Sequence, residues 1–417
     1  MERQNVVWAE VDEQGRLVLP EEVVRDHGLK PGARVRIENG ERDIRVHRPA
    51  THLSKIYIEP TSLCNLNCRT CIRNNWEEQG GRMSAATYER ILDGLHAMEE
   101  KPTVMFGGLG EPLSHPRIIT MVQQAKATGA RVELITNGTL LTETRSRRLI
   151  EAGLDVLWVS IDGATPESYS DVRLGAQLPK VLANLDSFRR LRKGSHRPRP
   201  QIGVAFVWMK RNVNDLPKVI DMGQRLGATR FSVTNVLPYT EDLQKEVLYS
   251  RALRNITYMQ SPWLPQISLP KMDLNEATGA AFLGALTSNL NVSLAGFNLA
   301  GANDVCSFVE VGSLAIGWDG SASPCLALLH THTSYLHGKE HVSYRHIIGS
   351  ITERELWDLW MDPGFLAYRE KVQGFGFAPC TFCGGCDMSE TNEEDCLGNT
   401  FPVCGGCLWA QGMIHCP

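Results

Sequence analysis

The sequence predicts an α/β protein built around a partial (β/α)6 barrel, with a small β module before it and a cysteine-rich domain after it. Three observations lead to this fold class: apolar runs alternating with helical stretches, a change of pattern near residue 50, and an uneven distribution of cysteine. The 417 residues are enough for two or three domains with packed cores. We expect a module at 1–50, a barrel at 51–260, a connection at 261–304 and a cysteine-rich domain at 305–417.

The barrel is predicted by six short apolar segments, at 56–58, 104–106, 132–135, 156–161, 202–207 and 231–233. Between them lie stretches with helical spacing, among them 84–98, 115–128, 141–152 and 214–226. Ser84 and Thr142 are suitable N-cap residues, and Gly129, Gly153 and Gly227 are suitable stops. Alternating strands and helices indicate a parallel sheet covered by helices. In such a barrel the reactive side chains gather at the C-terminal ends of the strands.

The composition is that of an ordinary globular protein, with 42% hydrophobic and 22% charged residues and a net charge of -4. No apolar run approaches the length of about 18 residues that a membrane-spanning helix needs. The first residues lack the apolar core of a signal peptide. We therefore expect a cytoplasmic protein without a membrane partner.

The twelve cysteines are distributed unevenly. Three lie within 64–71, Cys306 and Cys325 stand alone, and seven lie in the last 38 residues. A chain that used cysteine only as a small core residue would scatter it. Disulfides are rare in a reducing cytosol, so metal binding or thiolate chemistry is the better interpretation.

Cys64, Cys68 and Cys71 form a C-x3-C-x2-C motif directly after the first barrel strand. Closely spaced thiolates suit an iron–sulfur cluster. Three protein ligands to a four-iron cluster leave one iron open, and an open iron can bind a substrate directly. The spacing alone also allows a zinc site without its fourth ligand, or three core cysteines.

This motif, placed after the first strand, resembles the signature of the radical S-adenosylmethionine (SAM) enzymes. The resemblance implies a TIM-like radical SAM barrel and a [4Fe–4S] cluster on Cys64, Cys68 and Cys71, which are then the catalytic residues. It also implies that SAM binds the open iron and is cleaved reductively to a 5′-deoxyadenosyl radical, which abstracts hydrogen from the substrate. Many members have an aromatic residue before the third cysteine, whereas this chain has Thr70, so adenine must pack on other groups such as Ile72.

Further SAM contacts are expected at the ends of the following strands. The glycine-rich run at 106–112 lets the backbone approach a ligand closely, and the resemblance implies that it binds the SAM ammonium group. Polar residues at the next strand ends are candidates for the ribose, or are ordinary caps and turns. Arg173 resembles an arginine near the SAM carboxylate, or is a solvated surface residue. The expected SAM-binding residues are Gly107, Gly108, Gly110, Glu111, Asn137, Ser160, Asp162 and Arg173.

The C-terminal cysteines resemble a SPASM domain, which carries auxiliary iron–sulfur clusters. Cys306 and Cys325 have the C-x13-G-x4-C spacing that opens this domain. The resemblance implies one or two auxiliary [4Fe–4S] clusters, but the later spacing departs from the usual pattern and leaves the ligand assignment open. The candidate ligands are Cys306, Cys325, Cys380, Cys383, Cys386, Cys396, Cys404, Cys407 and Cys416.

Two alternatives remain for these cysteines. Cys380, Cys383, Cys404 and Cys407 also have a spacing close to that of a zinc ribbon. Cys-Gly-Gly-Cys occurs twice and could be a redox dithiol. Five histidines between Cys325 and Cys380 could bind metal or move protons, or lie in exposed loops: His330, His332, His337, His341 and His346.

The N-terminal 50 residues resemble the AbrB/SpoVT swapped-hairpin family in their order of strand, GRLVLP, short helix, Pro-Gly turn and strand. Such modules are often DNA-binding dimers. Nine Lys and Arg against ten Asp and Glu leave no basic surface for phosphates here. We therefore expect a homodimer or a substrate-docking surface, and no nucleic acid.

The domain order, with the tail runs at 396–399 and 404–412, resembles the radical SAM maturases linked to tungsten-cofactor oxidoreductases. This resemblance implies that a protein or cofactor is modified during maturation of such an oxidoreductase, with electrons from ferredoxin or flavodoxin. One alternative is a peptide-modifying radical SAM enzyme that forms thioether or carbon–carbon crosslinks. Another is a DNA-binding iron–sulfur redox sensor.

Overall fold

The computed structural model describes residues 7–39, 44–76, 78–192, 199–250, 265–273, 275–286, 290–294, 297–298, 305–336, 338–383 and 386–417. Its centre is a nine-stranded sheet with the order β10-β9-β8-β7-β6-β5-β14-β15-β18. Its six parallel barrel strands are β5 (Lys55–Ile58), β6 (Thr103–Phe106), β7 (Val132–Thr136), β8 (Val156–Ser160), β9 (Gln201–Trp208) and β10 (Ala228–Asn235). All six predicted strands are therefore present, in the predicted order, and the partial (β/α)6 barrel is confirmed.

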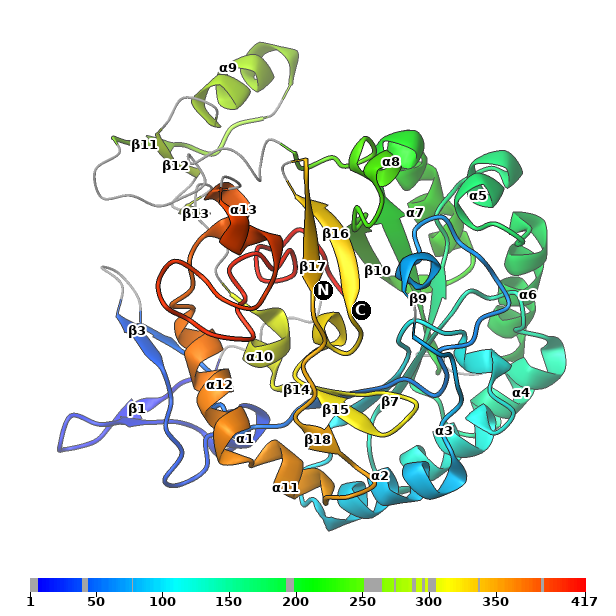
Figure 1. Cartoon of the computed structure of the whole chain (residues 1–417), viewed down its shortest axis with the longest axis horizontal. Coiled ribbons are helices and arrows are strands. Elements are labelled where there is room, and N and C mark those ends of the chain that lie inside the picture. Colours follow the sequence, from blue (N-terminus) through cyan, green and yellow to red (C-terminus); the bar gives the residue numbers. More distant parts are fainter. Residues whose placement is uncertain are drawn as a thin grey trace.

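Helices cover the outside of these strands and form the outer arc in Figure 1. They are α2 (Ala85–Ala97), α3 (Ile118–Ala127), α4 (Glu143–Glu151), α5 (Pro166–Val172), α6 (Leu178–Leu191) and α7 (Leu216–Arg225). The hydroxyls of Ser84 and Thr142 accept hydrogen bonds from the amides at the starts of α2 and α4, as predicted. Strands β5, β6 and β8 are buried along nearly their whole length, which explains their apolar sequences, whereas β10 at the edge of the sheet is only partly buried and contains polar residues.

The cysteine-rich domain continues the barrel sheet. Strand β14 (Ser313–Ile316) pairs in parallel with β5, and β15 (Ser321–Ser323) and β18 (Gly349–Ser350) extend it in antiparallel fashion. Its other elements are α10 (Ser307–Val311), β16 (His332–Leu336), β17 (Lys339–Ser343), α11 (Leu356–Trp360), α12 (Pro363–Gly374) and α13 (Cys380–Cys383). The sheet therefore fixes this domain against the first barrel strand, whose end carries the cysteine motif.

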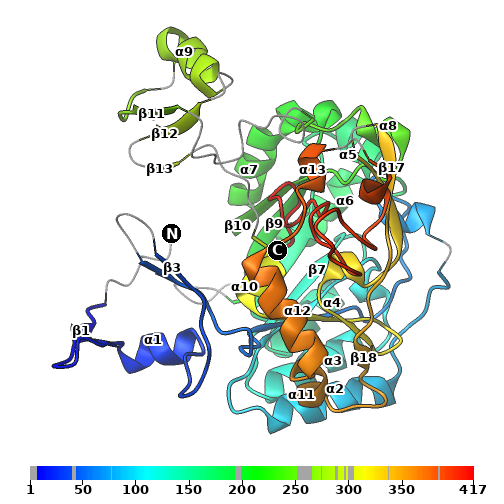
Figure 2. The ribbon, with the colours of Figure 1, turned by 60° about the vertical axis from the view of Figure 1, so that its left-hand side comes forward.

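The N-terminal module lies to one side of the barrel (Figure 2). It contains β1 (Glu10–Val11), β2 (Leu17–Val18), α1 (Glu21–Asp26), β3 (Ile37–Asn39) and β4 (Ile44–Val46). The strands form two separate antiparallel pairs, β1–β2 and β3–β4. The short helix after residue 20 lies where it was expected, between strand pairs.

The segment expected to be a connection contains a small folded unit. Strand β11 (Gln266–Leu269) pairs in parallel with β12 (Asn291–Leu294), helix α9 (Glu276–Leu286) lies between them in sequence, and β13 (Phe297–Asn298) completes a three-stranded sheet. Helix α9 is rich in Ala and Gly and has no clear apolar face, so its periodicity gave no signal. Before this unit the structure describes the short helix α8 (Glu241–Gln244), and 251–264 lie outside the described residues.

None of the helices in the described ranges combines the length and the apolar character that crossing a membrane requires.

Candidate active site and cysteine centres

The loop after β5 presents three cysteines to one cavity of about 270 Å³, which we call the cluster cavity. Cys64, Cys68 and Cys71 all line it, and all three have free thiols. Arg73 braces the loop by donating hydrogen bonds to the carbonyls of Ser62 and Leu66 at 3.2 and 3.0 Å. The folded chain therefore holds three sulfurs toward a common space, as three ligands of one cluster require.

Hydrogen-bond donors point at these sulfurs. Asn137 Nδ2 and Arg173 Nη1 each lie 3.8 Å from a sulfur, that of Cys64 and that of Cys68 respectively. Burial raises the pKa of both thiols, so iron binding, which needs thiolates, must release their protons. The donors stabilise the negative charge that remains on the ligands. The residues present therefore fit an iron–sulfur cluster.

Asp162 and Arg173 form a buried ion pair beside the cysteines. Arg173 Nε donates to Asp162 Oδ2 at 2.5 Å, and the amide of Val207 donates to the other oxygen at 2.7 Å. Asp162 is fully buried and does not line the cluster cavity, whereas Arg173 does. The structure therefore places Asp162 behind the arginine, where it fixes the guanidinium, and not at the surface where a ribose contact was expected.

The glycine run lies against the end of β5. A Cβ on Gly110 would stand 1.8 Å from the carbonyl oxygen of Thr61, and one on Gly108 would stand 2.8 Å from the Glu59 side chain. Only glycine allows this approach at either position. Gly108 and Gly110 line the cluster cavity, while Gly107 lines a neighbouring one.

Glu111 ties the glycine run to the next strand. Its buried carboxylate accepts hydrogen bonds from Thr136 Oγ1 at 2.7 Å, from the Asn137 amide at 2.8 Å and from the Leu113 amide at 3.0 Å. Burial raises its pKa, although these hydrogen bonds lower it in part. Ser160, at the end of β8, completes the polar wall of the cluster cavity.

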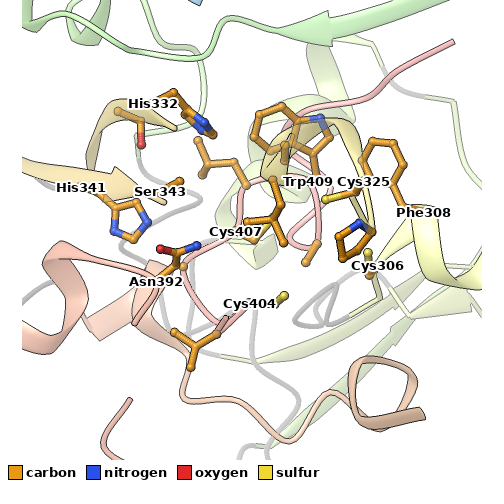
Figure 3. Close-up of a pocket in the computed structure, with 18 of the residues that line it drawn as sticks. Cys306, Phe308, Cys325, His332, His341, Ser343, Asn392, Cys404, Cys407 and Trp409 are labelled. Carbon is orange, nitrogen blue, oxygen red and sulfur yellow. The ribbon is translucent and has the colours of Figure 1, made fainter. Parts of the chain in front are cut away.

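Four cysteines from distant segments meet in a second, small cavity of about 40 Å³, the four-cysteine cavity (Figure 3). They are Cys306, Cys325, Cys404 and Cys407. Burial raises the pKa of all four thiols, that of Cys306 to about 12. The hydroxyl of Tyr368 lies 3.2 Å from Cys404 Sγ. His332, His341 and Trp409 also line this cavity.

Among the described residues, no three His, Cys, Asp or Glu side chains lie close enough to hold a single metal ion. Four cysteines that line one cavity suit an iron–sulfur cluster, whose ligands bind different iron atoms. The structure groups Cys404 and Cys407 with Cys306 and Cys325, a grouping that the sequence spacing left open.

The remaining candidate cysteines lie elsewhere. Cys380 is buried in α13, and the side chain of Cys383 lies outside the described residues. Cys386 and Cys396 are exposed. Cys416 lines a third cavity, between the other two.

This central cavity has a volume of about 190 Å³ and is enclosed mainly by apolar side chains. It shares Ile72, Gly108 and Leu109 with the cluster cavity. It shares His332 and Trp409 with the four-cysteine cavity. A molecule bound there would contact residues that also line each of the two cysteine cavities.

Sequence patterns gave no signal for two acidic residues: Glu59, which lines the central cavity, and Glu78, which lines an outer cavity beside it. Both contact His330, which was a candidate only as one of five histidines. Glu59 and His330 are 271 residues apart in sequence, and no local pattern connects them.

Two family models match this chain, one over the barrel and one over the cysteine-rich domain. The model of the radical SAM superfamily matches residues 58–198, and that of the SPASM iron–sulfur cluster-binding domain matches 306–387. The tungsten-containing aldehyde ferredoxin oxidoreductase cofactor-modifying protein of Pyrococcus furiosus is 32% identical over 370 residues, which are 87% of this chain and 96% of that protein. The AdoMet-dependent heme synthase of Methanosarcina barkeri is 31% identical over 182 residues, 43% of this chain and 50% of that protein.

Two solved structures share the fold. Streptococcus suis SuiB bound to S-adenosylmethionine is 15% identical with a TM-score of 0.50, covering 82% of this chain and 72% of that chain. Native anSMEcpe with bound AdoMet is 17% identical with a TM-score of 0.50, covering 80% of this chain and 86% of that chain. At this identity the likeness concerns the fold alone.

Proposed function

Because the chain belongs to the radical SAM superfamily and carries a SPASM domain, we propose that it modifies the cofactor, or the cofactor-carrying protein, of a tungsten-containing oxidoreductase during maturation. The observation that carries this proposal is the 32% identity to the Pyrococcus furiosus cofactor-modifying protein, over 96% of its length. As a radical SAM enzyme, the protein uses a [4Fe–4S] cluster that supplies the electron for reductive cleavage of SAM.

In this proposal, Cys64, Cys68 and Cys71 hold the first cluster. Their convergence on the cluster cavity and the donors beside Cys64 and Cys68 support this role. The residues that we propose to contact SAM are those of the same cavity wall, Gly108, Gly110, Asn137, Ser160 and Arg173. Glu111 lines the same cavity and is a further candidate contact. Asp162 fixes Arg173 from behind the wall, and Gly107 lines the neighbouring cavity.

For the auxiliary site, we propose that Cys306, Cys325, Cys404 and Cys407 hold one [4Fe–4S] cluster, because they line one cavity without disulfides. A second auxiliary cluster would draw its ligands from the other candidates, Cys380, Cys383, Cys386, Cys396 and Cys416.

The substrate group would occupy the central cavity, between the two cysteine centres. Apolar walls such as Met105, Leu326 and Leu329 exclude water and protect a radical from quenching. Trp409 and Leu237 separate this space from the four-cysteine cavity, which they also line.

Two partners follow as finer proposals. The first is a ferredoxin or flavodoxin, because SAM cleavage consumes one electron per event. The second is another copy of this chain, joined through the N-terminal module. That module has two open-edged strand pairs with large exposed apolar side chains, Trp8, Val11, Leu17, Val18, Ile37, Ile44 and Val46.

Anaerobic assays of the reconstituted enzyme test the main proposal. With SAM and a reductant the enzyme should form 5′-deoxyadenosine, and with the apo form of a tungsten-containing aldehyde oxidoreductase it should alter the mass of that protein or its cofactor. Modification of a short peptide in place of the oxidoreductase would favour the peptide-modifying alternative. Light scattering of the wild type and of Trp8→Glu tests the dimer, which the charged variant should dissociate.

A further inference from the structure

Three titratable side chains, Glu59, His330 and Glu78, form a hydrogen-bonded line through the wall of the central cavity. His330 Nε2 lies 3.0 Å from Glu59 Oε2, and His330 Nδ1 lies 2.6 Å from Glu78 Oε2. Glu59 follows β5, Glu78 follows the cysteine loop, and His330 precedes β16 in the cysteine-rich domain. Three separate segments therefore meet in one hydrogen-bonded line.

The two ends of this line face different spaces. Glu59 is fully buried and lines the central cavity. The side chain of Glu78 is 26% exposed and lines an outer cavity of about 220 Å³, together with Asp319 and Arg345. His330, with a side chain only 7% exposed, lines both cavities. The imidazole is thus the partition between the central cavity and the side open to solvent.

Further contacts fix the positions of these three side chains. The other oxygen of Glu59 accepts the amide of Leu109 in the glycine run at 2.9 Å, and the other oxygen of Glu78 accepts the amide of Thr331 at 3.1 Å. The indole of Trp76 packs on the His330 ring, with 4.4 Å between centroids. Each carboxylate therefore keeps one oxygen for the imidazole.

Charge favours a proton on this ring. Burial alone would lower the pKa of His330, but the hydrogen bonds and charges of Glu59 and Glu78 outweigh it and raise the pKa. Asp319 and Arg345 line the outer cavity with His330. His332 lies on the other side, and burial lowers its pKa to about 4, so it is neutral near pH 7. A doubly protonated His330 donates to both carboxylates at once.

We infer that Glu59 and His330 are the acid–base pair of the central cavity and that Glu78 connects this pair to solvent. The Nε2 proton passes to Glu59 and on to a group in the cavity, which leaves a neutral ring that keeps its Nδ1 proton. The reverse step returns the proton to Nε2. One proton moves in each direction, no electron is involved, and Glu78 lets the Nδ1 proton exchange with water.

This inference rests on the proposed function only in placing the substrate in the central cavity. The test uses the reconstituted enzyme with SAM, reductant and the apo oxidoreductase, and measures product formed per 5′-deoxyadenosine. His330→Gln and Glu59→Gln should lower this ratio about 100-fold or more, the range of a lost acid–base group. Free imidazole, entering through the outer cavity, should restore part of this ratio in His330→Gly. If His330 had only a structural role, added imidazole would not restore it.

His47 provides a matched control. It is another buried histidine between two glutamates, 3.2 Å from Glu38 and 2.8 Å from Glu310, but it lines none of the cavities described above. His47→Gln should leave the ratio unchanged. An unchanged ratio in His330→Gln, or an equal loss in His47→Gln, would overturn the inference.

A second readout needs no substrate. In the NMR spectrum of ¹⁵N-histidine-labelled holoenzyme, the His330 ring signal is identified as the signal that is absent from the spectrum of His330→Gln. Its N–H protons should exchange with water more slowly in Glu78→Gln, and an unchanged rate would contradict the path to solvent. If the wild type forms 5′-deoxyadenosine but leaves the oxidoreductase unmodified, the proposed function fails, and this exchange rate still tests the path from His330 to solvent.

Discussion

The two cysteine centres of this protein are assembled in opposite ways. Cys64, Cys68 and Cys71 lie within eight residues on one loop, which is braced by its own Arg73. The four-cysteine cavity collects Cys306 and Cys325 with cysteines from the last part of the chain. The first centre is thus local, whereas the second exists only after the domain has folded.

This difference has a physical consequence. A local site needs little ordering of the chain beyond one loop, because closing a short loop costs little entropy. A long-range site couples its ligands to the packing of the whole domain, so loss of a ligand there should disturb more of the fold. The predictions below test this contrast, from the largest expected effect to the smallest.

Removing a local ligand should abolish the chemistry. Cys68→Ala should lose about four irons per chain and all formation of 5′-deoxyadenosine, because three thiolates are the minimum for this cluster. Iron analysis and anaerobic chromatography measure both losses. The auxiliary iron should remain, and its disappearance would contradict the independence of the two centres.

Replacing a cysteine of the four-cysteine cavity should lower the iron content without stopping SAM cleavage. Cys404→Ala should lose about four irons per chain but still form 5′-deoxyadenosine, because its cavity does not include the first cluster. An unchanged iron content in Cys404→Ala would refute the grouping of the four cysteines.

The ion pair behind the first centre should contribute mainly to stability. Asp162→Asn leaves the buried Arg173 without its counter-charge, which should cost about 3–5 kcal/mol of unfolding free energy. Denaturant unfolding under anaerobic conditions measures the change. Asp221→Asn, which breaks an exposed pair with Arg225, should cost well under about 1 kcal/mol.

The hydroxyl beside the second centre should have the smallest effect. Tyr368→Phe removes the hydrogen bond to Cys404 Sγ, which stabilises the more negative, reduced form of a bound cluster. The midpoint potential of one auxiliary cluster should therefore fall, while that of the first cluster stays constant. Redox titration followed by electron paramagnetic resonance distinguishes the two, and a shift of the first cluster would contradict the assignment.

Much of the barrel could be predicted because its signals are local. Each strand contains a short apolar run, and Ser84 and Thr142 mark helix starts that the structure shows. Helix α9 and its sheet were missed, because a helix of small residues has no apolar face to detect. The N-terminal strands were expected, but their two separate pairings could not be derived from the alternation of residues alone.

The sequence by itself determined the reaction class through its resemblance to the radical SAM enzymes, because the C-x3-C-x2-C motif and the glycine run that carry this resemblance are short, local patterns. Only the tertiary structure decided which tail cysteines meet, that Asp162 stands behind Arg173, and that His330 joins Glu59 to Glu78. These contacts join residues far apart in the chain. Their geometry depends on how β14 docks on β5, and no local spacing encodes that pairing.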